Sequence, residues 1–193
     1  MKTLTIILSL FSLAVFSQEP AVPSYTLAIP EKWGTETIPF PISFAPQIAY
    51  TGVEDVRFSP GWGKAKSEEY WSYAFLWYLN GKIKITPAAL DSNMKYYYAG
   101  LIAGNGPNIP AEKLIPVTTS FKKMKKAKGD AETYSGTIHM TDYMQQKPIM
   151  LNVIVHLKYA GNKTLVFFEL SPQPSTYPIW KDLHKLWLDL KCK

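Results

Sequence analysis

Two histidines and one glutamate lie on three consecutive apolar segments in the C-terminal half of the sequence. His139 stands in GTIHMTD, His156 in LNVIVHLKY and Glu169 in TLVFFELSP. Neighbouring residues of a strand point to opposite sides, so the apolar residues of each segment form one row and these polar residues belong to the other. If short turns join the segments, the three polar side chains become direct or diagonal neighbours of one another and of Asn152.

Such a cluster has several chemical uses. Two imidazoles and a carboxylate can hold a transition-metal ion with open positions, or they can act as an acid and a base. They can also form a polar recognition surface, or simply line a half-exposed sheet face. The sequence has neither an HExxH motif nor histidines spaced as HxH, and a register shift of one residue would separate the groups. These alternatives stay open, and so does the identity of any metal.

A second candidate position is the turn that carries Arg57 and Trp62. Arg57 is the only arginine of the chain and lies in GVEDVRFSPGW. A guanidinium forms two parallel hydrogen bonds with a carboxylate, a role that lysine fills less well. The partner is either an internal carboxylate, for example Glu68 or Glu69 across the turn, or an anionic group of a ligand.

Five lysines gather in the segment FKKMKKAKGD. They are Lys122, Lys123, Lys125, Lys126 and Lys128. We expect them at the tip of a hairpin, where they keep the tip solvated or contact an anionic surface such as lipid or polysaccharide. Aromatic residues do not alternate with these lysines, which argues against binding of single-stranded nucleic acid. No specific nucleic-acid partner is therefore expected.

The elements that must position these residues follow from hydrophobic periodicity and turn signals. Strands are predicted at 53–59, 69–79, 82–86, 114–122, 133–141, 149–159 and 164–171. Thr86-Pro87 begins a first helix that ends near 104–107, and a second helix covers about 178–190. Short connections favour antiparallel pairing. We therefore predict an α+β fold, in which an antiparallel β-sheet has two amphipathic helices packed on one face.

The segment 69–79 is apolar on both sides, as in a central strand. One row of alternate residues is heavily aromatic and is predicted to face the core, although it could also form a ligand platform. Its members are Trp71, Tyr73, Phe75, Trp77 and Leu79.

The N-terminal residues 1–17, MKTLTIILSLFSLAVFS, have the pattern of a signal peptide that is cleaved near Ser17. Their apolar run is shorter than the ~20 residues that span a bilayer. Residues 18–50 are rich in proline and predict an extended segment, and 51–193 predict a single domain. We expect the protein to be periplasmic or extracellular.

The composition suits one globular domain, with 193 residues, 47% hydrophobic residues and 19% charged residues. The single cysteine, Cys192, cannot form an internal disulfide, and is either a free thiol or a bridge between chains. The sequence has no GxSxG, P-loop, GxGxxG, CxxC or EF-hand motif, which excludes the enzyme classes that depend on them. No cofactor is predicted.

Two runs, GVEDVRFSPGWGKAKSEEYWSYAFLWYLNG and FELSPQPSTYPIWKDLHKLW, resemble a family of small exported bacterial proteins of uncharacterised function. The resemblance implies export and one compact domain, and it carries no catalytic motif. The leading prediction is a non-catalytic binding or accessory module for an unknown small molecule, glycan or envelope component. One alternative is a small metal-dependent or acid/base hydrolase that uses the histidine and glutamate cluster. The other is a cell-envelope structural protein that contacts an anionic surface through the lysines.

Overall fold

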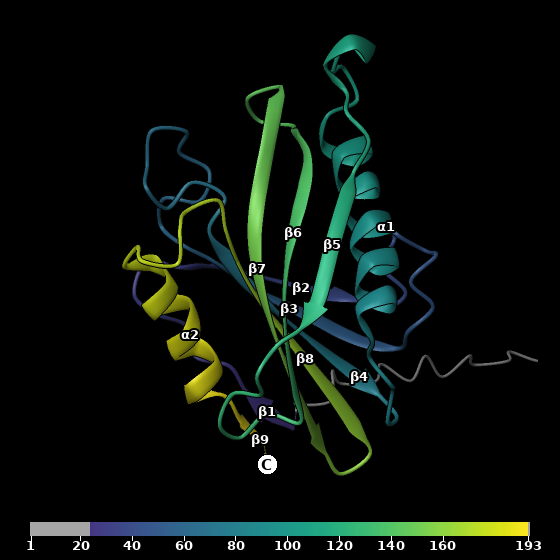
Figure 1. Cartoon of the computed structure of the whole chain (residues 1–193), viewed down its shortest axis with the longest axis vertical. Coiled ribbons are helices and arrows are strands. Elements are labelled where there is room, and N and C mark those ends of the chain that lie inside the picture. The colour runs from purple at the N-terminus through teal and green to yellow at the C-terminus, as the bar shows by residue number, and fades with distance from the viewer. Residues whose placement is uncertain (1–23, 193) are drawn as a thin grey trace, which may run out of the picture.

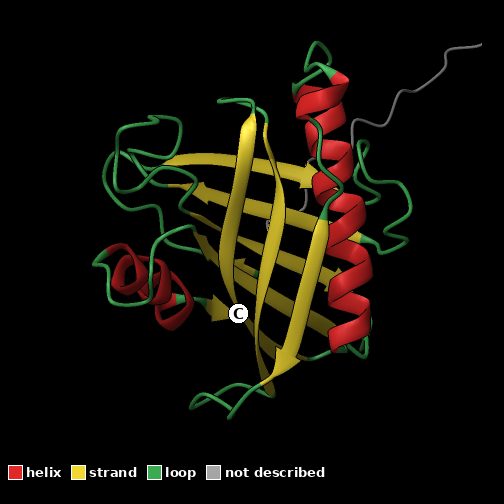
Figure 2. Ribbon diagram, turned by 45° about the horizontal axis from the view of Figure 1, so that its top comes forward, coloured by secondary structure: helices red, strands yellow, loops and turns green. Residues whose placement is uncertain are grey.

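A computed structural model of the chain describes residues 24–192, which form a seven-stranded antiparallel sheet, a two-stranded sheet and two α-helices (Figures 1 and 2). The predicted signal peptide lies outside the described residues. The elements are β1 Tyr25–Thr26, β2 Gly34–Pro39, β3 Gly52–Phe58, β4 Tyr73–Asn80, α1 Pro87–Asn105, a short 3₁₀-helix Ala111–Lys113, β5 Thr118–Lys123, β6 Glu132–Asp142, β7 Lys147–Ala160, β8 Lys163–Ser171, α2 Ile179–Asp189 and β9 Lys191–Cys192. The predicted α+β class with an antiparallel sheet is confirmed.

The large sheet has the strand order β2-β3-β4-β8-β7-β6-β5. Its centre, β4 and β8, is buried on both sides, as the apolar character of 69–79 predicts. In the register of β7 with β8, Val155 pairs with Phe168 and His156 pairs with Phe167. Val155 and Phe168 lie in the core on one side of the sheet, and Phe167 lies in the core on the other.

Helix α1 begins where the sequence predicts it, at Thr86-Pro87. The Thr86 hydroxyl accepts a hydrogen bond from the Ala89 N–H at 3.1 Å, and Pro87 occupies the first helical position. The buried side of α1 packs on the aromatic row of β4 that was predicted to face the core. The shared core also includes Leu90, Met94, Tyr97, Tyr98 and Ile102 of the helix.

Helix α2 packs on the opposite face of the sheet, whereas both helices were predicted on the same face. Its buried residues contact the second row of the central strands, including Leu76 of β4 and Phe167 of β8. The physical reason is that this second row is itself apolar, so it requires a cover of its own. In Figure 1 the two helices accordingly lie on either side of the sheet.

Two further strands differ from the prediction. The segment 82–86 forms no strand, because β4 already has β3 and β8 on its two edges. The place at the edge of the sheet next to β3 is taken instead by β2, from the proline-rich segment that was predicted only as extended. Within residues 24–192 no helix is both long enough and apolar enough to cross a membrane.

Candidate functional site

The structure brings together only part of the predicted polar cluster. Glu169 pairs with Ile154, so it lies diagonal to His156, and the His156 Nε2 atom is 3.1 Å from Glu169 Oε1. Asn152 lies four positions along β7 from His156, or about 13 Å at the rise of a strand. His139 pairs with Met150 and is exposed. Neither Asn152 nor His139 therefore joins the pair.

The predicted open face is covered at this position by α2. His156 and Glu169 are each only 2% exposed. His184 of α2 is half-buried, and its Nδ1 atom lies 2.9 Å from Glu169 Oε1. The hydrogen bond with Glu169 raises the pKa of His184 above its ordinary value of 6.5, against the opposing effect of burial. The structure thus replaces His139 with His184 as the second histidine of the cluster.

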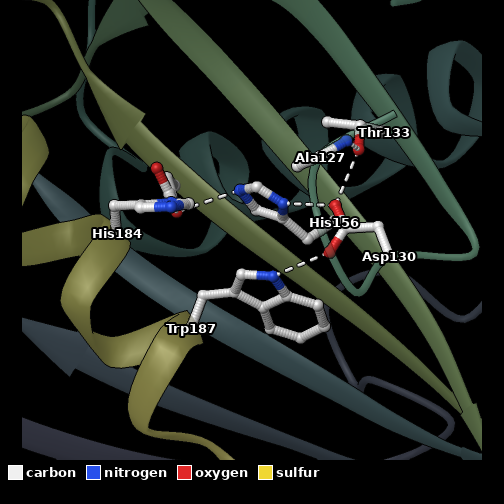
Figure 3. A network of polar contacts seen from close by, with 7 residues as sticks. Ala127, Asp130, Thr133, His156, His184 and Trp187 are labelled. Atoms are coloured by element: carbon white, nitrogen blue, oxygen red, sulfur yellow. Dashed lines mark hydrogen bonds and ion pairs between the residues drawn. The ribbon is translucent and has the colours of Figure 1, made fainter. Parts of the chain in front are cut away.

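Asp130 completes a buried polar network on the other side of His156 (Figure 3). It lies at the end of the lysine-rich loop between β5 and β6 and is 5% exposed. Its Oδ2 atom is 2.6 Å from His156 Nδ1 and also accepts the Thr133 hydroxyl at 2.6 Å. Its Oδ1 atom accepts the Trp187 indole N–H at 2.9 Å. The network therefore connects α2 to three parts of the sheet face: the β5–β6 loop, β7 and β8.

Beside α2, this face of the sheet has an open groove of about 570 Å³ with a mixed polar and apolar lining. Asn152, Lys122 and Trp180 line it, and the Asn152 amide donates to the Gln173 carbonyl at 3.2 Å. The predicted lysine tip is where the sequence places it: Lys122 and Lys123 end β5, and the other three lysines follow in the exposed β5–β6 loop.

Arg57 is fully engaged within the protein. All five of its N–H donors are used: two bond the Asp55 carboxylate, and the others bond the carbonyls of Leu27, Ala28 and Val56. The predicted two-bonded carboxylate contact exists, but its partner is Asp55 and neither Glu68 nor Glu69. Because Arg57 is buried with no free donor, it is not available to an anionic ligand.

Trp62 lines an aromatic pocket of about 250 Å³ on the α1 face, between the β2–β4 half of the sheet and the C-terminal half of α1. Seven aromatic side chains line this pocket: Phe44, Phe58, Trp62, Trp71, Tyr73, Tyr97 and Tyr143. Glu36 and Asn105 are the exposed polar residues of its wall, and among residues 24–192 no lysine or arginine contributes to it. Arg57 and Trp62 are therefore separated, because Arg57 points to the other face of β3.

The loop before β4 fixes the position of Trp62. The Trp71 N–H donates to the Trp62 carbonyl at 3.0 Å, and the Glu69 carboxylate accepts the Gly61 N–H at 2.7 Å. Trp71 has a φ of 55°, a conformation that is rare for a bulky residue and persists only where the surrounding contacts hold it, as at many ligand sites. The indole nitrogens of Trp62 and Trp71 are buried and make no hydrogen bond within residues 24–192. The Trp71 indole lies near the Tyr70 hydroxyl and lowers the pKa of that hydroxyl. The Trp62 N–H has no such neighbour among the described residues, so Trp62 offers the clearer free donor.

A buried carboxyl group lies behind this pocket. Glu54 is fully buried and accepts hydrogen bonds from Tyr97 Oη at 2.6 Å and from Trp77 Nε1 at 2.9 Å. Burial raises the pKa of Glu54 to about 7, with a smaller rise from Glu36, while the two hydrogen bonds lower it. A buried acid with a shifted pKa next to an aromatic cavity is typical of ligand sites.

The Glu54 pKa gives the protein a pH-dependent stability. The folded-state pKa of about 7 is above the ordinary 4.5, so protonation stabilises the folded state fully below pH 4.5, and this stabilisation is lost as the pH rises through 7. The shift corresponds to roughly 3 kcal/mol. We expect Glu54→Gln to remove this part of the pH dependence, measured by urea unfolding of both proteins between pH 4.5 and 8. Equal pH slopes for the two proteins would contradict the assignment.

Sequence reasoning missed Asp130, His184 and Glu54 as members of these sites. His184 lies four residues after Trp180 and three before Trp187, both buried on α2, and this helical spacing places it beside the apolar stripe. Glu54 lies on the same side of β3 as Val56, which marks it as a charge in an apolar row. Asp130 gave no comparable signal, since its partners come from distant segments.

Comparison of the chain with protein-family models, with curated proteins and with solved structures gives no match.

Proposed function

We propose that this protein is an exported, non-catalytic binding module that takes a neutral sugar ring, free or at the end of a glycan, in the aromatic pocket. The observation that carries the proposal is the buried Trp62 N–H, a hydrogen-bond donor without a partner in the described residues, in the wall of a cavity lined by seven aromatic rings. The signal-peptide pattern of residues 1–17 supports export.

The wall chemistry favours a neutral polyhydroxy ligand over an anion. Aromatic rings stack on flat apolar faces, and a donor and an acceptor in the wall of a pocket can bind hydroxyl groups. Trp62 supplies the donor, Glu36 supplies acceptors, and the Asn105 amide supplies both. The absence of lysine and arginine from the described pocket wall leaves nothing to neutralise a carboxylate or phosphate.

The pocket is largely formed before any ligand arrives. Val56, Trp71, Tyr73 and Tyr97 line it and are almost fully buried in the core. The hydrogen bonds from Trp71 to Trp62 and from Gly61 to Glu69 hold the loop above them. A rigid wall lowers the entropy lost on binding.

Titration with a panel of neutral sugars, followed by NMR, tests the proposal. We expect Trp62→Phe, which keeps a ring but removes the donor, to weaken binding by about 5- to 10-fold, the effect of one lost buried hydrogen bond. The matched control is Trp33→Phe, a tryptophan on the α2 face, which should leave the affinity unchanged.

The substitution Glu36→Gln distinguishes a neutral sugar from an organic cation as the ligand of the pocket. Glutamine keeps a hydrogen-bond acceptor at position 36, so the affinity for a neutral sugar should change little, and it should be insensitive to salt. Binding of organic cations that Glu36→Gln abolishes would instead identify a cation site formed by aromatic rings. That result, or no response to any sugar, would overturn the proposal.

A further inference from the structure

His156 has one nitrogen that is satisfied and one that is not. Nδ1 lies 2.6 Å from Asp130 Oδ2, and because an ionised carboxylate only accepts hydrogen bonds, Nδ1 is the donor. Nε2 is buried and makes no hydrogen bond with any described residue, although Glu169 Oε1 is only 3.1 Å away. With the proton on Nδ1, Nε2 presents a lone pair to a carboxylate oxygen, and two such electron-rich atoms repel unless a cation lies between them.

A metal ion fits this position better than a proton. An N–H on Nε2 would lie in the plane of the imidazole ring, and in this plane it does not reach Glu169 in hydrogen-bonding geometry. A metal ion can lie to the side of the line between the two atoms, within bonding distance of both. Zn²⁺ bonds histidine nitrogen and carboxylate oxygen at about 2.0–2.2 Å, which separates tetrahedral ligand atoms by about 3.4 Å.

His184 supplies a third ligand atom close to the other two. Its Nδ1 atom is 2.9 Å from Glu169 Oε1, and one ligand atom from each of His156, Glu169 and His184 lies within 4.8 Å of the others. Small rearrangements of the three side chains, outward from Glu169 and with the two histidine nitrogens within about 3.4 Å of each other, give tetrahedral spacing. Figure 3 shows the two imidazoles directed toward one another from β7 and α2.

We propose that His156, Glu169 and His184 bind one divalent transition-metal ion of the zinc type, at a site separate from the aromatic pocket and on the opposite face of the sheet. Asp130 acts as the outer carboxylate that fixes the tautomer and orientation of His156, an arrangement that accompanies most histidine ligands of metals. Asp130 is held in turn by Trp187 and Thr133.

A bound ion would affect the packing of α2 and would have one coordination position not filled by the protein. It connects α2 to β7 and β8, so binding stabilises the packing of α2 on the sheet. Three protein ligands leave the fourth tetrahedral position free. The side chain of His184 is 41% exposed, so solvent and a metal ion can reach the cluster from the side of α2.

The test uses the protein after removal of any purification tag, with Cys192→Ser as the common background, because an exposed thiol also binds zinc. We expect one Zn²⁺ per chain by calorimetry, and a rise in the unfolding midpoint on addition of Zn²⁺. His184→Ala removes a direct ligand from a half-exposed position and should weaken binding by more than the roughly 10- to 100-fold typical of an outer partner. The matched control, His139→Ala, removes an exposed histidine outside the cluster and should bind like the parent.

Two results would overturn the proposal. One is a parent protein that binds no Zn²⁺, or binds it equally after His184→Ala and His139→Ala. The other is a nitrogen-15 NMR spectrum in which His156 Nε2 carries a proton in the presence of Zn²⁺, which would show that a proton and no metal lies between His156 and Glu169.

Discussion

Replacing Asp130 with alanine is expected to destabilise the folded protein by about 3–5 kcal/mol, since each buried donor left without an acceptor costs roughly 1–3 kcal/mol. The substitution leaves three buried donors without their acceptor: His156 Nδ1, the Trp187 indole N–H and the Thr133 hydroxyl. Each of them then carries a desolvation penalty that the hydrogen bond had offset. Since these donors come from β6, β7 and α2, the effect falls on the packing of the helix against the sheet.

Urea unfolding followed by far-ultraviolet circular dichroism measures this effect as a shift in midpoint at unchanged slope. Asp189→Ala is a suitable control, because it removes an acidic residue of α2 whose ion pair with Lys185 is exposed. That pair should contribute less than about 1 kcal/mol. Equal losses for the two substitutions would show that the buried network does not hold α2.

The second large effect is expected for Arg57→Lys, although the charge is kept. An ammonium group has three donors, so it cannot replace the five hydrogen bonds that the guanidinium makes to Asp55 and to the carbonyls around it. At least two acceptors lose a charged donor, and we expect a loss of about 2–4 kcal/mol. The segment at Leu27 and Ala28 should loosen first, because Arg57 binds both of its carbonyls.

Hydrogen exchange at residues 25–28, together with the free energy of unfolding, tests this expectation. Lys123→Ala provides the comparison, since it removes a cation whose pair with Glu132 is largely exposed. If Arg57→Lys is as mild as Lys123→Ala, the buried guanidinium is not a principal attachment of the N-terminal segment.

Local sequence signals predicted most elements of this fold. The Thr86-Pro87 pair marks the start of α1, and the alternation in 149–159 and 164–171 places Val155 and Phe168 on one face. These features depend on neighbours in sequence, and local periodicity reports them well. The edge strand β2 escaped prediction because prolines suppress the strand signal, although proline is tolerated at a sheet edge.

The assignment of faces could not be made from the same signals. Both rows of β4 and β8 are apolar, so periodicity does not say which row a given helix covers. Placing α2 on the other face is what buries His156 and Glu169 and brings His184 to them. The pairing of Asp130 with His156, 26 residues away in the sequence, depends on tertiary contacts, which one sequence does not reveal.

The small sheet formed by β1 and β9 has a consequence for chain connectivity. Tyr25 lies opposite Cys192, so the first and last strands of the described chain leave the domain side by side. A short peptide could join them, and the chain could be opened instead in the exposed β5–β6 loop, without breaking any strand pair. The architecture is therefore compatible with circular permutation, and the order in which its strands are synthesised is not dictated by their packing.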